Sequence, residues 1–424
     1  MGIRQTFRSK LLRDTASYSI INILDKAIPF LIMPIISRVL TKEDMGYYSL
    51  YQVTFQILIP ILTLCLEYPI YINYFKIDKD KYPQFFSTGV WLTIFVFIAT
   101  TIISLLFFNQ LSSLFGLNKT WLFVTYIIVF LNYFCQLRLI LWQQQQKPHS
   151  YGLFSVPFVL IKNILGLLII LLSNIGWQGI IIGHLIGQVI FCSIAIVSFV
   201  KEGYLILYFD KKEISKQIKV GVPVCIHKIS GWLSHSLNRI IINSLLGASA
   251  TGSYGIGATF GTIVTVIEDA VNKAYAPYLF EQLSKYNNER KKKLTKLIVT
   301  YYSLFISFGV FLSLIGYFGV GFIFGEKYTD TRHFIIPIVL SSVINGLYKL
   351  HVNFIFYTEK THLVATNTII CAILNIFVAY IFTYFWGLWG AAVSTIIIQF
   401  ILYLLTIIVS HKYYPIYGSR ENPS

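Results

Sequence analysis

Long apolar segments separated by short polar connections occupy almost the whole chain. A helix that crosses the roughly 30 Å hydrocarbon core of a bilayer needs about 20 predominantly apolar residues. Such segments lie between clusters of charges or turn residues at about 15–39, 45–74, 84–108, 120–143, 151–172, 177–200, 220–246, 252–280, 297–324, 333–357, 362–385 and 387–410. The sequence therefore predicts an all-α integral membrane protein with about twelve transmembrane helices.

The composition excludes an ordinary water-soluble enzyme. Apolar residues make up 56% of the 424 positions and charged residues only 12%, and the mean hydropathy is +0.67. All connections are short, so no soluble catalytic domain is expected on either face. The five cysteines lie singly in apolar runs, and we expect them to be buried apolar residues.

The net charge of +16 indicates on which side of the membrane the loops lie, and it does not indicate a nucleic-acid partner. With the N-terminus inside, the outer connections hold only Arg38, Lys42, Lys119, Lys327 and Arg332, and most other basic loop residues fall inside. The positive-inside rule then predicts a multi-pass protein of the cytoplasmic (inner) membrane with both termini cytoplasmic. The basic run 289–296 is either a topology anchor or a patch for lipid headgroups.

Two segments of the first half of the chain recur in the second half. Leu40, Gly46 and Tyr48 match Leu246, Gly252 and Tyr254 at an offset of 206, and Gly176, Gly179 and Gln188 match Gly387, Gly390 and Gln399 at an offset of 211. Repeats of this kind are typical of transporters. The predicted organisation is a six-helix lobe at 1–200, a cytoplasmic linker at 201–219, a second six-helix lobe at 220–411 and a cytoplasmic tail at 412–424.

Formal charges fall inside the predicted spans, where each costs about 2.5–3.5 kcal/mol if it faces lipid at the centre of a helix. The cations are Lys26, Lys162, Lys228, Arg239, Lys273 and Lys349, and the anions are Asp25, Glu67, Glu268 and Asp269. Polar residues recur every three or four positions in the first, seventh, eighth and tenth spans, which places them on one face of each helix. A shared hydrated cavity is expected between these faces.

The excess of cations favours a substrate that carries phosphate, because Lys and Arg donate charge-assisted hydrogen bonds to phosphate oxygens. An alternative is that Asp25 with its neighbours, or Asp269 with Lys273 one turn away, form ion pairs that merely hold helices together. His227 and His235 share a helix face, but no further ligand completes a metal site. No cofactor or metal is expected.

Several stretches resemble the polysaccharide repeat-unit flippases, the Wzx-type proteins of the multidrug, oligosaccharidyl-lipid and polysaccharide exporter superfamily. The resemblance extends over nearly the whole chain and rests on residues 34–50, 221–257, 276–283, 324–340 and 387–397. The stretch that begins at Arg239 (RIIINSLLG) and the last two spans are the more specific parts. Asn238 stands where the family commonly has Asp, which puts an ion-coupling role at this position in doubt.

This resemblance implies two pseudo-symmetric six-helix lobes around a V-shaped central cavity. It also implies a flippase, not an enzyme, that moves an undecaprenyl-diphosphate-linked oligosaccharide from the inner to the outer leaflet by alternating access. The glycan would be destined for O-antigen, capsule or another surface polysaccharide. Besides the lipid-linked substrate and membrane lipids, a polysaccharide polymerase and a chain-length regulator are the implied partners.

The polar residues of the spans are assigned two hypothetical roles. The substrate-binding candidates are Lys228, Arg239, Lys349, Lys162, Lys26, His235 and Asn238, and the candidates for ion coupling or gating are Asp25, Glu67, Glu268, Asp269 and Lys273. Other classes of protein stay open. A multidrug antiporter of the same superfamily should have a more anionic cavity. A membrane-embedded polymerase or O-acyltransferase should have a large outer loop or a recognisable set of catalytic residues. A non-transporting scaffold would leave the intramembrane charges unexplained.

Overall fold

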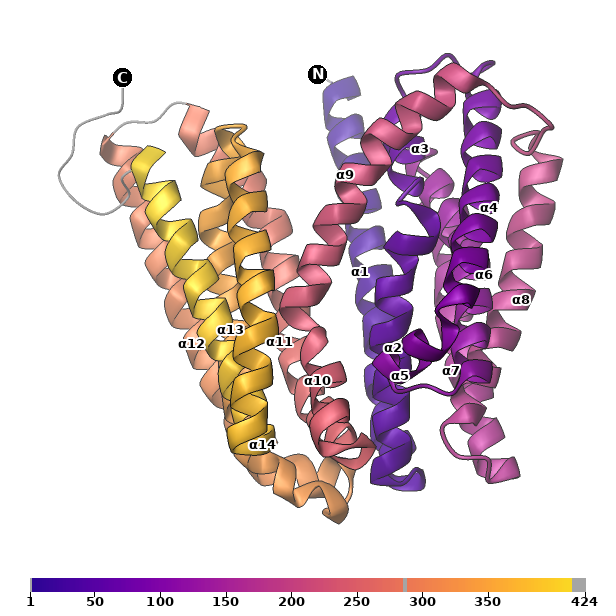
Figure 1. The fold of residues 1–424 in the computed structure, drawn as a ribbon. Helices are drawn as coiled ribbons and strands as arrows, with labels where there is room; N and C mark the ends of the chain where they lie inside the picture. Colours follow the sequence, from indigo (N-terminus) through magenta and orange to yellow (C-terminus); the bar gives the residue numbers. More distant parts are fainter. Residues whose placement is uncertain (1, 285–287, 414–424) are drawn as a thin grey trace. The chain divides into compact units, whose positions relative to one another are not determined.

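Helices form almost all of the described chain. The computed structural model describes the backbone of residues 2–284 and 288–413 and the side chains of residues 17–284 and 289–413. In chain order the elements are α1 (Gly2–Val39), α2 (Lys42–Thr63), α3 (Glu67–Asn73), α4 (Tyr82–Leu106), α5 (Phe108–Phe115), α6 (Lys119–Gln144), α7 (Pro148–Ser173), α8 (Gln178–Lys201), α9 (Lys211–His235), α10 (Leu237–Leu246), α11 (Ala248–Ser284), α12 (Asn288–Phe324), the 3-10 helix η1 (Glu326–Thr331), α13 (Arg332–Tyr357) and α14 (Thr361–Tyr413). Figure 1 shows their course.

Within the described part of the chain, nine helices are long and apolar enough to cross a membrane. The pair α2 and α3, bent by 63° at the break between them, makes a tenth span if the two are counted together. All twelve predicted segments fall on helices, since α14 contains two of them on either side of Gly387 and α9 with α10 contains another. The all-α integral membrane fold is thereby confirmed, whereas the number of twelve crossings stays a prediction.

Local sequence signals explain where several helices begin and end. Thr41 and Asp44 form a capping box at the start of α2, in which each side chain accepts a hydrogen bond from the other's backbone N–H. Asn118 caps α6 by accepting a hydrogen bond from the Thr120 N–H. Gly116, at a φ of 64°, ends α5, a short helix that the sequence did not predict.

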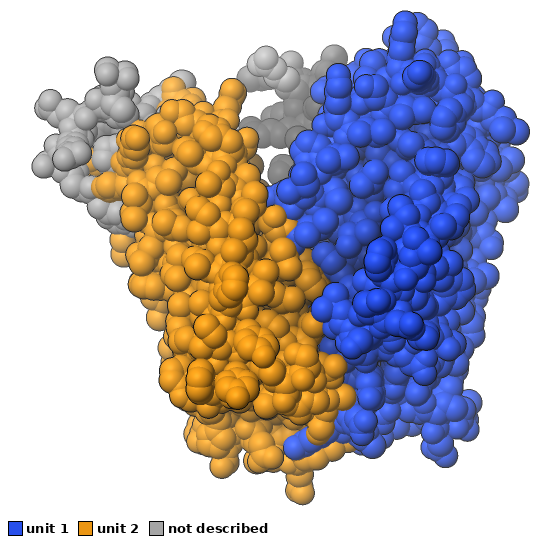
Figure 2. All heavy atoms as spheres, in the orientation of Figure 1, with its two compact units in different colours: residues 1–229 blue, residues 230–424 orange. Residues whose placement is uncertain are grey.

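The described chain divides into two compact units, unit 1 at residues 1–229 and unit 2 at residues 230–424, which Figure 2 colours separately. The division falls inside α9, whereas the predicted linker at 201–219 covers the connection after α8 and the first turns of α9. The assignment of residues to two six-helix lobes stays a prediction. The predicted tail at 412–424 lies, apart from its first two residues, outside the described residues.

The second repeated segment has the same local structure in both halves of the chain. Gly176 precedes α8 with a φ of +66°, and its match Gly387 has a φ of +60° at the kink of α14. A Cβ on Gly179 would lie 2.7 Å from Ile170 of the preceding helix, and one on Gly390 would lie 1.8 Å from the Phe382 carbonyl oxygen. Both hairpins therefore need glycine at the turn and at the close approach that comes after it.

Glycines bring α7 and α8 together in unit 1. A Cβ on Gly183 would lie 2.1 Å from the backbone nitrogen of Gly166, and one on Gly187 would lie 2.6 Å from the Cβ of Lys162. Small residues at such crossings are expected in a membrane, where helix association depends on close packing rather than on the exclusion of water. The Gly187 contact also fixes the backbone from which Lys162 extends.

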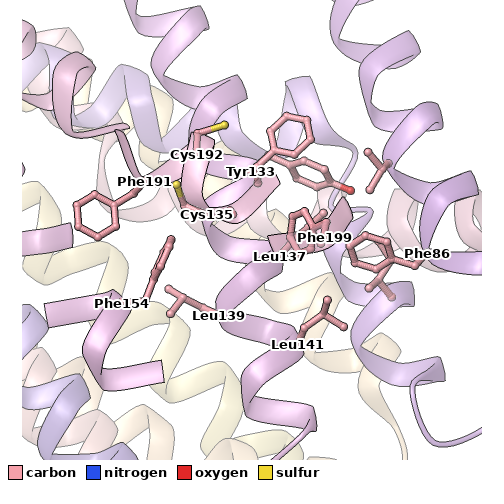
Figure 3. Packing of buried hydrophobic residues seen from close by; sticks show 14 of the residues in the cluster. Phe86, Tyr133, Cys135, Leu137, Leu139, Leu141, Phe154, Phe191, Cys192 and Phe199 are labelled. Carbon is pink, nitrogen blue, oxygen red and sulfur yellow. The ribbon is translucent and has the colours of Figure 1, made fainter. Parts of the chain in front are cut away.

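An aromatic cluster fills the interior of unit 1 between α4, α6, α7 and α8 (Figure 3). The rings of Phe154 and Phe191 meet edge to face with centroids 5.1 Å apart, and those of Phe86 and Phe199 lie 5.2 Å apart. Cys135 and Cys192 are part of the same cluster, and all five cysteines are buried and free, as the sequence indicated.

The segment after α8 is tied back to unit 1 by a buried arginine. Arg138 of α6 donates hydrogen bonds of 2.9 and 2.5 Å to the two carboxylate oxygens of Glu202 and lies 4.0 Å from the centre of the Trp142 ring. Burial by itself raises the pKa of Glu202, but the hydrogen bonds and the charge of Arg138 hold that pKa below its ordinary value. The next residues are held by hydrogen bonds from Ser87 to the Tyr204 carbonyl and from Trp91 to the Ile206 carbonyl.

Unit 2 is built around α13, which packs against α11, α12 and α14. Glycines again mark the crossings, because a Cβ on Gly309 would lie 2.4 Å from Val343 and one on Gly316 would lie 2.6 Å from Ile335. Asn238 of α10 is 2% exposed, and its side-chain nitrogen donates to the Ala391 carbonyl and to Thr395 of α14. Its side-chain oxygen accepts a hydrogen bond from Asn375.

We expect Gly183→Ala to lower the free energy of unfolding by about 1–3 kcal/mol, because the new methyl group meets backbone atoms that cannot move independently. The measurement is the thermal midpoint of the detergent-solubilised protein, followed by size-exclusion chromatography. Gly319→Ala is the matched control, since its Cβ would meet only the flexible end of Ile323 at 3.3 Å. Equal midpoints for the two variants would contradict the proposed helix crossing.

Arg138→Met should lower the free energy of unfolding by about 2 kcal/mol at pH 7, because it leaves the Glu202 carboxylate without its partner. A carboxyl group with a lowered folded-state pKa contributes stability above its ordinary pKa of 4.5, and that contribution is lost as pH falls through the lowered pKa. The midpoint difference from the wild type should therefore shrink in acid. Lys81→Met, which removes an exposed pair with Asp78, is the control and should change little.

Candidate functional site

A cavity of about 660 Å³ lies within unit 1, between α2, α3, α6, α7 and α9. Its volume is in the range of about 300–1,000 Å³ that small-molecule sites occupy. Residues spaced three, four or seven apart on α6, namely Asn132, Gln136, Ile140 and Gln143, face it and form one wall. The part of the lining that comes from α2 is mostly apolar and consists of Phe55, Ile59 and Thr63.

The polar lining of the cavity combines three kinds of side chain. Its charged residues are Glu67, Lys162 and Lys228, its amides are Asn132, Gln136 and Gln143, and its tyrosines are Tyr68, Tyr71 and Tyr133. Two cations against one carboxylate give the lining an excess of one positive charge. Amides and phenols can donate to and accept from hydroxyl groups, and aromatic rings offer flat apolar faces.

The break between α2 and α3 positions two of these residues. Leu64 and Cys65 have positive φ angles of 46° and 53°, which turns the chain before Glu67 begins α3. The break packs against α9, since a Cβ on Gly221 would lie 2.5 Å from the Leu64 carbonyl oxygen. Cys225 of α9 donates a hydrogen bond of 3.1 Å to the Pro60 carbonyl. Irregular backbone in a membrane needs such partners from neighbouring helices.

Lys228 and Glu67 form an ion pair in the cavity wall. The Lys228 Nζ lies 3.2 Å from the Glu67 Oε1 and 4.8 Å from the centre of the Tyr68 ring. The Lys228 side chain is 34% exposed and that of Glu67 is 12% exposed. A predicted substrate contact and a predicted gating residue are thus brought together.

Lys162 has a different environment. Its ammonium lies 4.7 Å from the centre of the Phe158 ring, one turn earlier on α7. Among residues 17–284 and 289–413, no carboxylate lies within ion-pair distance of it and no hydrogen-bond partner is found. Lys162 therefore has no direct ion-pair partner in the described chain, and the Asp25 carboxylate of α1 acts on it only from beyond ion-pair distance.

The polar stripe of α1 faces α7. Ser155 donates a hydrogen bond to the Asp25 Oδ2, and Tyr151 donates one of 3.5 Å to the Asn22 Oδ1. The other carboxylate oxygen of Asp25 is buried and has no hydrogen-bond partner within the described residues. Lys26, the neighbouring candidate, is exposed on α1.

In unit 2, Lys349 of α13 lies between two carboxylates of α11. Its Nζ is 3.2 Å from the Glu268 Oε2 and 2.8 Å from the Asp269 Oδ1. A Cβ on Gly346 would collide with the Glu268 carboxylate at 2.9 Å, so this glycine makes room for the acid. One turn further along α13, Asn353 donates a hydrogen bond of 2.7 Å to the Asn272 side-chain oxygen. The stripes predicted on the eighth and tenth spans thus meet each other.

The remaining candidates also belong to unit 2. His235 is exposed and contacts the side chains of Gln399 and Asn345, at 3.0 and 3.4 Å. Asn238 is occupied by its contacts with α14. Arg239 is half-buried on α10, and Lys273 is exposed on α11. The structure pairs Asp269 with Lys349, a partner that the sequence did not indicate.

The amide face of α6 is absent from the residues predicted from the sequence. Asn132, Gln136 and Gln143 follow a helical spacing of four and seven in an otherwise apolar span, and this signal was present in the sequence. A prediction based on formal charges passes over such uncharged residues. Tyr68 and Tyr71 were missed because the bend that starts α3 has neither Gly nor Pro at its two positive-φ positions.

Comparison with solved structures shows which known membrane proteins share the fold. The chain superimposes on the lipid II flippase MurJ in an inward closed conformation with a TM-score of 0.72, at 15% identity, over 94% of this chain and 87% of that one. It superimposes on an inward-facing multidrug resistance MATE family transporter of the MOP superfamily with a TM-score of 0.70, at 14% identity, over 92% of this chain and 97% of that one. At this level of identity the similarity shows the fold alone, which is that of a multi-pass, all-helical membrane protein.

Sequence comparison identifies the family. The chain belongs to the polysaccharide biosynthesis protein family, whose sequence model matches residues 11–283. It is 24% identical to a protein of the Lsg locus of Haemophilus influenzae over 87% of this chain and 90% of that protein. It is 23% identical to a membrane protein in the cps region of Klebsiella pneumoniae over 95% of this chain and 82% of that protein. The family expected from the sequence resemblance is confirmed.

The two lysines should differ in their effect on stability. Lys349→Met leaves the fully buried Glu268 without a counter-charge and should lower the free energy of unfolding by about 3 kcal/mol. Lys162→Met removes a cation without an ion-pair partner and should leave the thermal midpoint nearly unchanged. Adding Glu268→Gln and Asp269→Asn to Lys349→Met should restore stability. A larger loss in Lys162→Met than in Lys349→Met would refute the assigned environments.

Proposed function

We propose that the protein is a flippase that moves an undecaprenyl-diphosphate-linked oligosaccharide from the inner to the outer leaflet of the cytoplasmic membrane by alternating access. The observation that carries the proposal is the cavity of unit 1, with two lysines, one carboxylate, three amides and three tyrosines. Family membership in polysaccharide biosynthesis supports a glycan as cargo. The name of the similar lipid II flippase supports a lipid-linked form of that glycan.

The lining suits each polar part of such a substrate. Lys162 and Lys228 can donate charge-assisted hydrogen bonds to the oxygens of the diphosphate. The amides of α6 can exchange hydrogen bonds with sugar hydroxyls, and Tyr68 and Tyr71 can pack against sugar rings. Carrying these groups through hydrocarbon without partners would cost several kcal/mol for each. The polyprenyl tail has no such requirement and stays in lipid.

The other predicted residues take supporting roles in this proposal. Lys26 and Arg239 are further cations for acidic groups of the cargo. His235 is a further polar contact for it, and the buried Asn238 would hold α10 against α14 beside His235. Lys349 is already neutralised by two carboxylates, so its contribution to substrate binding is smaller. Asp25, Glu268, Asp269 and Lys273 are proposed for ion coupling or gating. In support, Asp25 and Glu268 each have one buried carboxylate oxygen without a hydrogen-bond partner in the described chain.

The topology in the proposal has both termini in the cytoplasm and the basic connections inside. An inside-negative potential assists the outward movement of an anion by about 2.3 kcal/mol per charge per 100 mV, which makes the potential one source of energy. The flippase delivers cargo and catalyses no covalent reaction. A polymerase and a chain-length regulator would act on the delivered units to build O-antigen, capsule or another surface polysaccharide.

A multidrug antiporter is the second candidate, favoured by the similarity to the MATE family transporter. Its cationic substrates would meet a lining with an excess of positive charge, which opposes their binding. The two candidates differ in what a deletion strain loses.

Deletion of the gene in its native host should abolish the surface glycan and leave single lipid-linked units that an externally added glycan-modifying enzyme cannot reach. Units accumulating on the outer leaflet would instead indicate a polymerase. An unchanged glycan with raised drug sensitivity would indicate the antiporter.

Complementation with point variants tests the site itself. Lys162→Met and Lys228→Met should insert normally in the membrane but restore surface glycan at least about tenfold less efficiently than the wild type, because each removes a phosphate contact. Lys79→Met, in an exposed loop, is the matched control and should complement fully. Complementation at the wild-type level by both cavity variants would contradict the assignment of Lys162 and Lys228 to phosphate binding.

A further inference from the structure

The ion pair between Lys228 and Glu67 lies in the wall of the cavity, where a substrate can reach it. Given the proposed flippase function, on which this inference rests, we propose that Glu67 stands in for a phosphate oxygen of the substrate on Lys228. An anionic group and the Glu67 carboxylate then compete for the same ammonium, and Glu67 acts as a specificity-determining residue. Glu67 disfavours the binding of neutral cargo, because it stays paired with Lys228 until an anionic group displaces its carboxylate.

The geometry of the pair permits this exchange. The Glu67 Oε1 lies 3.2 Å from the Lys228 Nζ, and both side chains line the cavity. A carboxylate and a phosphate present equivalent anionic oxygen acceptors to an ammonium group. Because this oxygen occupies one of the three donors of Lys228, a ligand oxygen can approach the others before Glu67 leaves.

The Glu67 carboxylate is incompletely satisfied. Its Oε2 is buried and has no hydrogen-bond partner within residues 17–284 and 289–413. The contrast is Glu202, whose two oxygens both accept hydrogen bonds from Arg138. A buried acceptor without a partner opposes the pairing that holds it there, so the Glu67 pair is weaker than that of Glu202.

The backbone at Glu67 also favours movement. Glu67 is the first residue of the seven-residue α3 and comes shortly after two non-glycine residues with positive φ angles, Leu64 and Cys65. Such conformations cost on the order of 1 kcal/mol each and persist only where the surroundings hold them. Here the holding contacts come from α9, through Gly221, Cys225 and Lys228 itself. Loss of the Lys228 contact therefore removes one of the restraints on α3.

Charge balance makes the exchange selective. With Glu67 paired, Lys162 is the cation of the lining left for a ligand, and it can neutralise one phosphate charge. Displacement of Glu67 adds Lys228, so two cations then face the two charges of a lipid-linked diphosphate. A neutral glycan or a cationic drug lacks the charge needed to displace the carboxylate.

The test is a binding titration of the purified full-length protein in detergent, with inorganic pyrophosphate and undecaprenyl diphosphate as probes. Glu67→Gln keeps the shape of the side chain and removes the competing charge, so it should bind both probes about threefold to tenfold more tightly than the wild type. Lys228→Gln should bind them more weakly. In the Lys228→Gln background, adding Glu67→Gln should have a much smaller effect, because only the direct repulsion between the Glu67 carboxylate and the anion remains.

Glu359→Gln, which removes an exposed carboxylate outside the cavity, is the matched control and should bind as the wild type does. Unchanged or weaker binding by Glu67→Gln, with a wild type that does bind, overturns the competition while leaving the proposed function intact. A wild type that binds neither probe overturns both. A gain in affinity of equal size in the Lys228→Gln background also overturns the competition, since the effect would not pass through Lys228.

Discussion

Hydrocarbon provides neither hydrogen bonds nor a hydrophobic force between helices, and this constraint governs the architecture. Helices approach closely only where glycine permits it, as at Gly183 against Gly166 in unit 1 and Gly309 against Val343 in unit 2. Polar side chains find partners on neighbouring helices, as Asn238 does on α14 and Lys349 does on α11. Where a polar group within the described spans lacks a protein partner, its position becomes informative about function.

Lysine side chains have different surroundings in the two units. In unit 2, Lys349 is held by two carboxylates and Gly346 makes room for one of them. In unit 1, the ammonium groups of Lys162 and Lys228 line a cavity with amides and tyrosines. The fold is shared with exporters whose names state different substrates. Selectivity must therefore be sought in the lining residues rather than in the helical frame.

Much of this architecture could be predicted from the sequence, because membrane-spanning helices are visible as apolar runs. Periodicity also placed polar stripes on the eighth and tenth spans and predicted a hydrated cavity beside them, and Asp269 and Lys349 of these stripes form an ion pair. The pairing itself could not be predicted, since Lys273 was the nearer partner along the chain. The bend before α3 could not be predicted, because neither Leu64 nor Cys65 is a residue type typical of turns. Without the bend, the position of Glu67 and Tyr68 beside α9 could not be predicted either.

The left-handed glycines Gly176 and Gly387 occupy matching places in the two similar sequence segments. Gly176 precedes α8 and Gly387 lies at the kink of α14, and each is followed three residues later by a second glycine at a close helix contact. The charged residues that pair or line a cavity have no such correspondence between the halves. An ancestral duplication would thus have kept the hinges of the hairpins and released the side chains between them. Substitutions at a few positions on α3 and α6 could then change the lining of the cavity without a new fold.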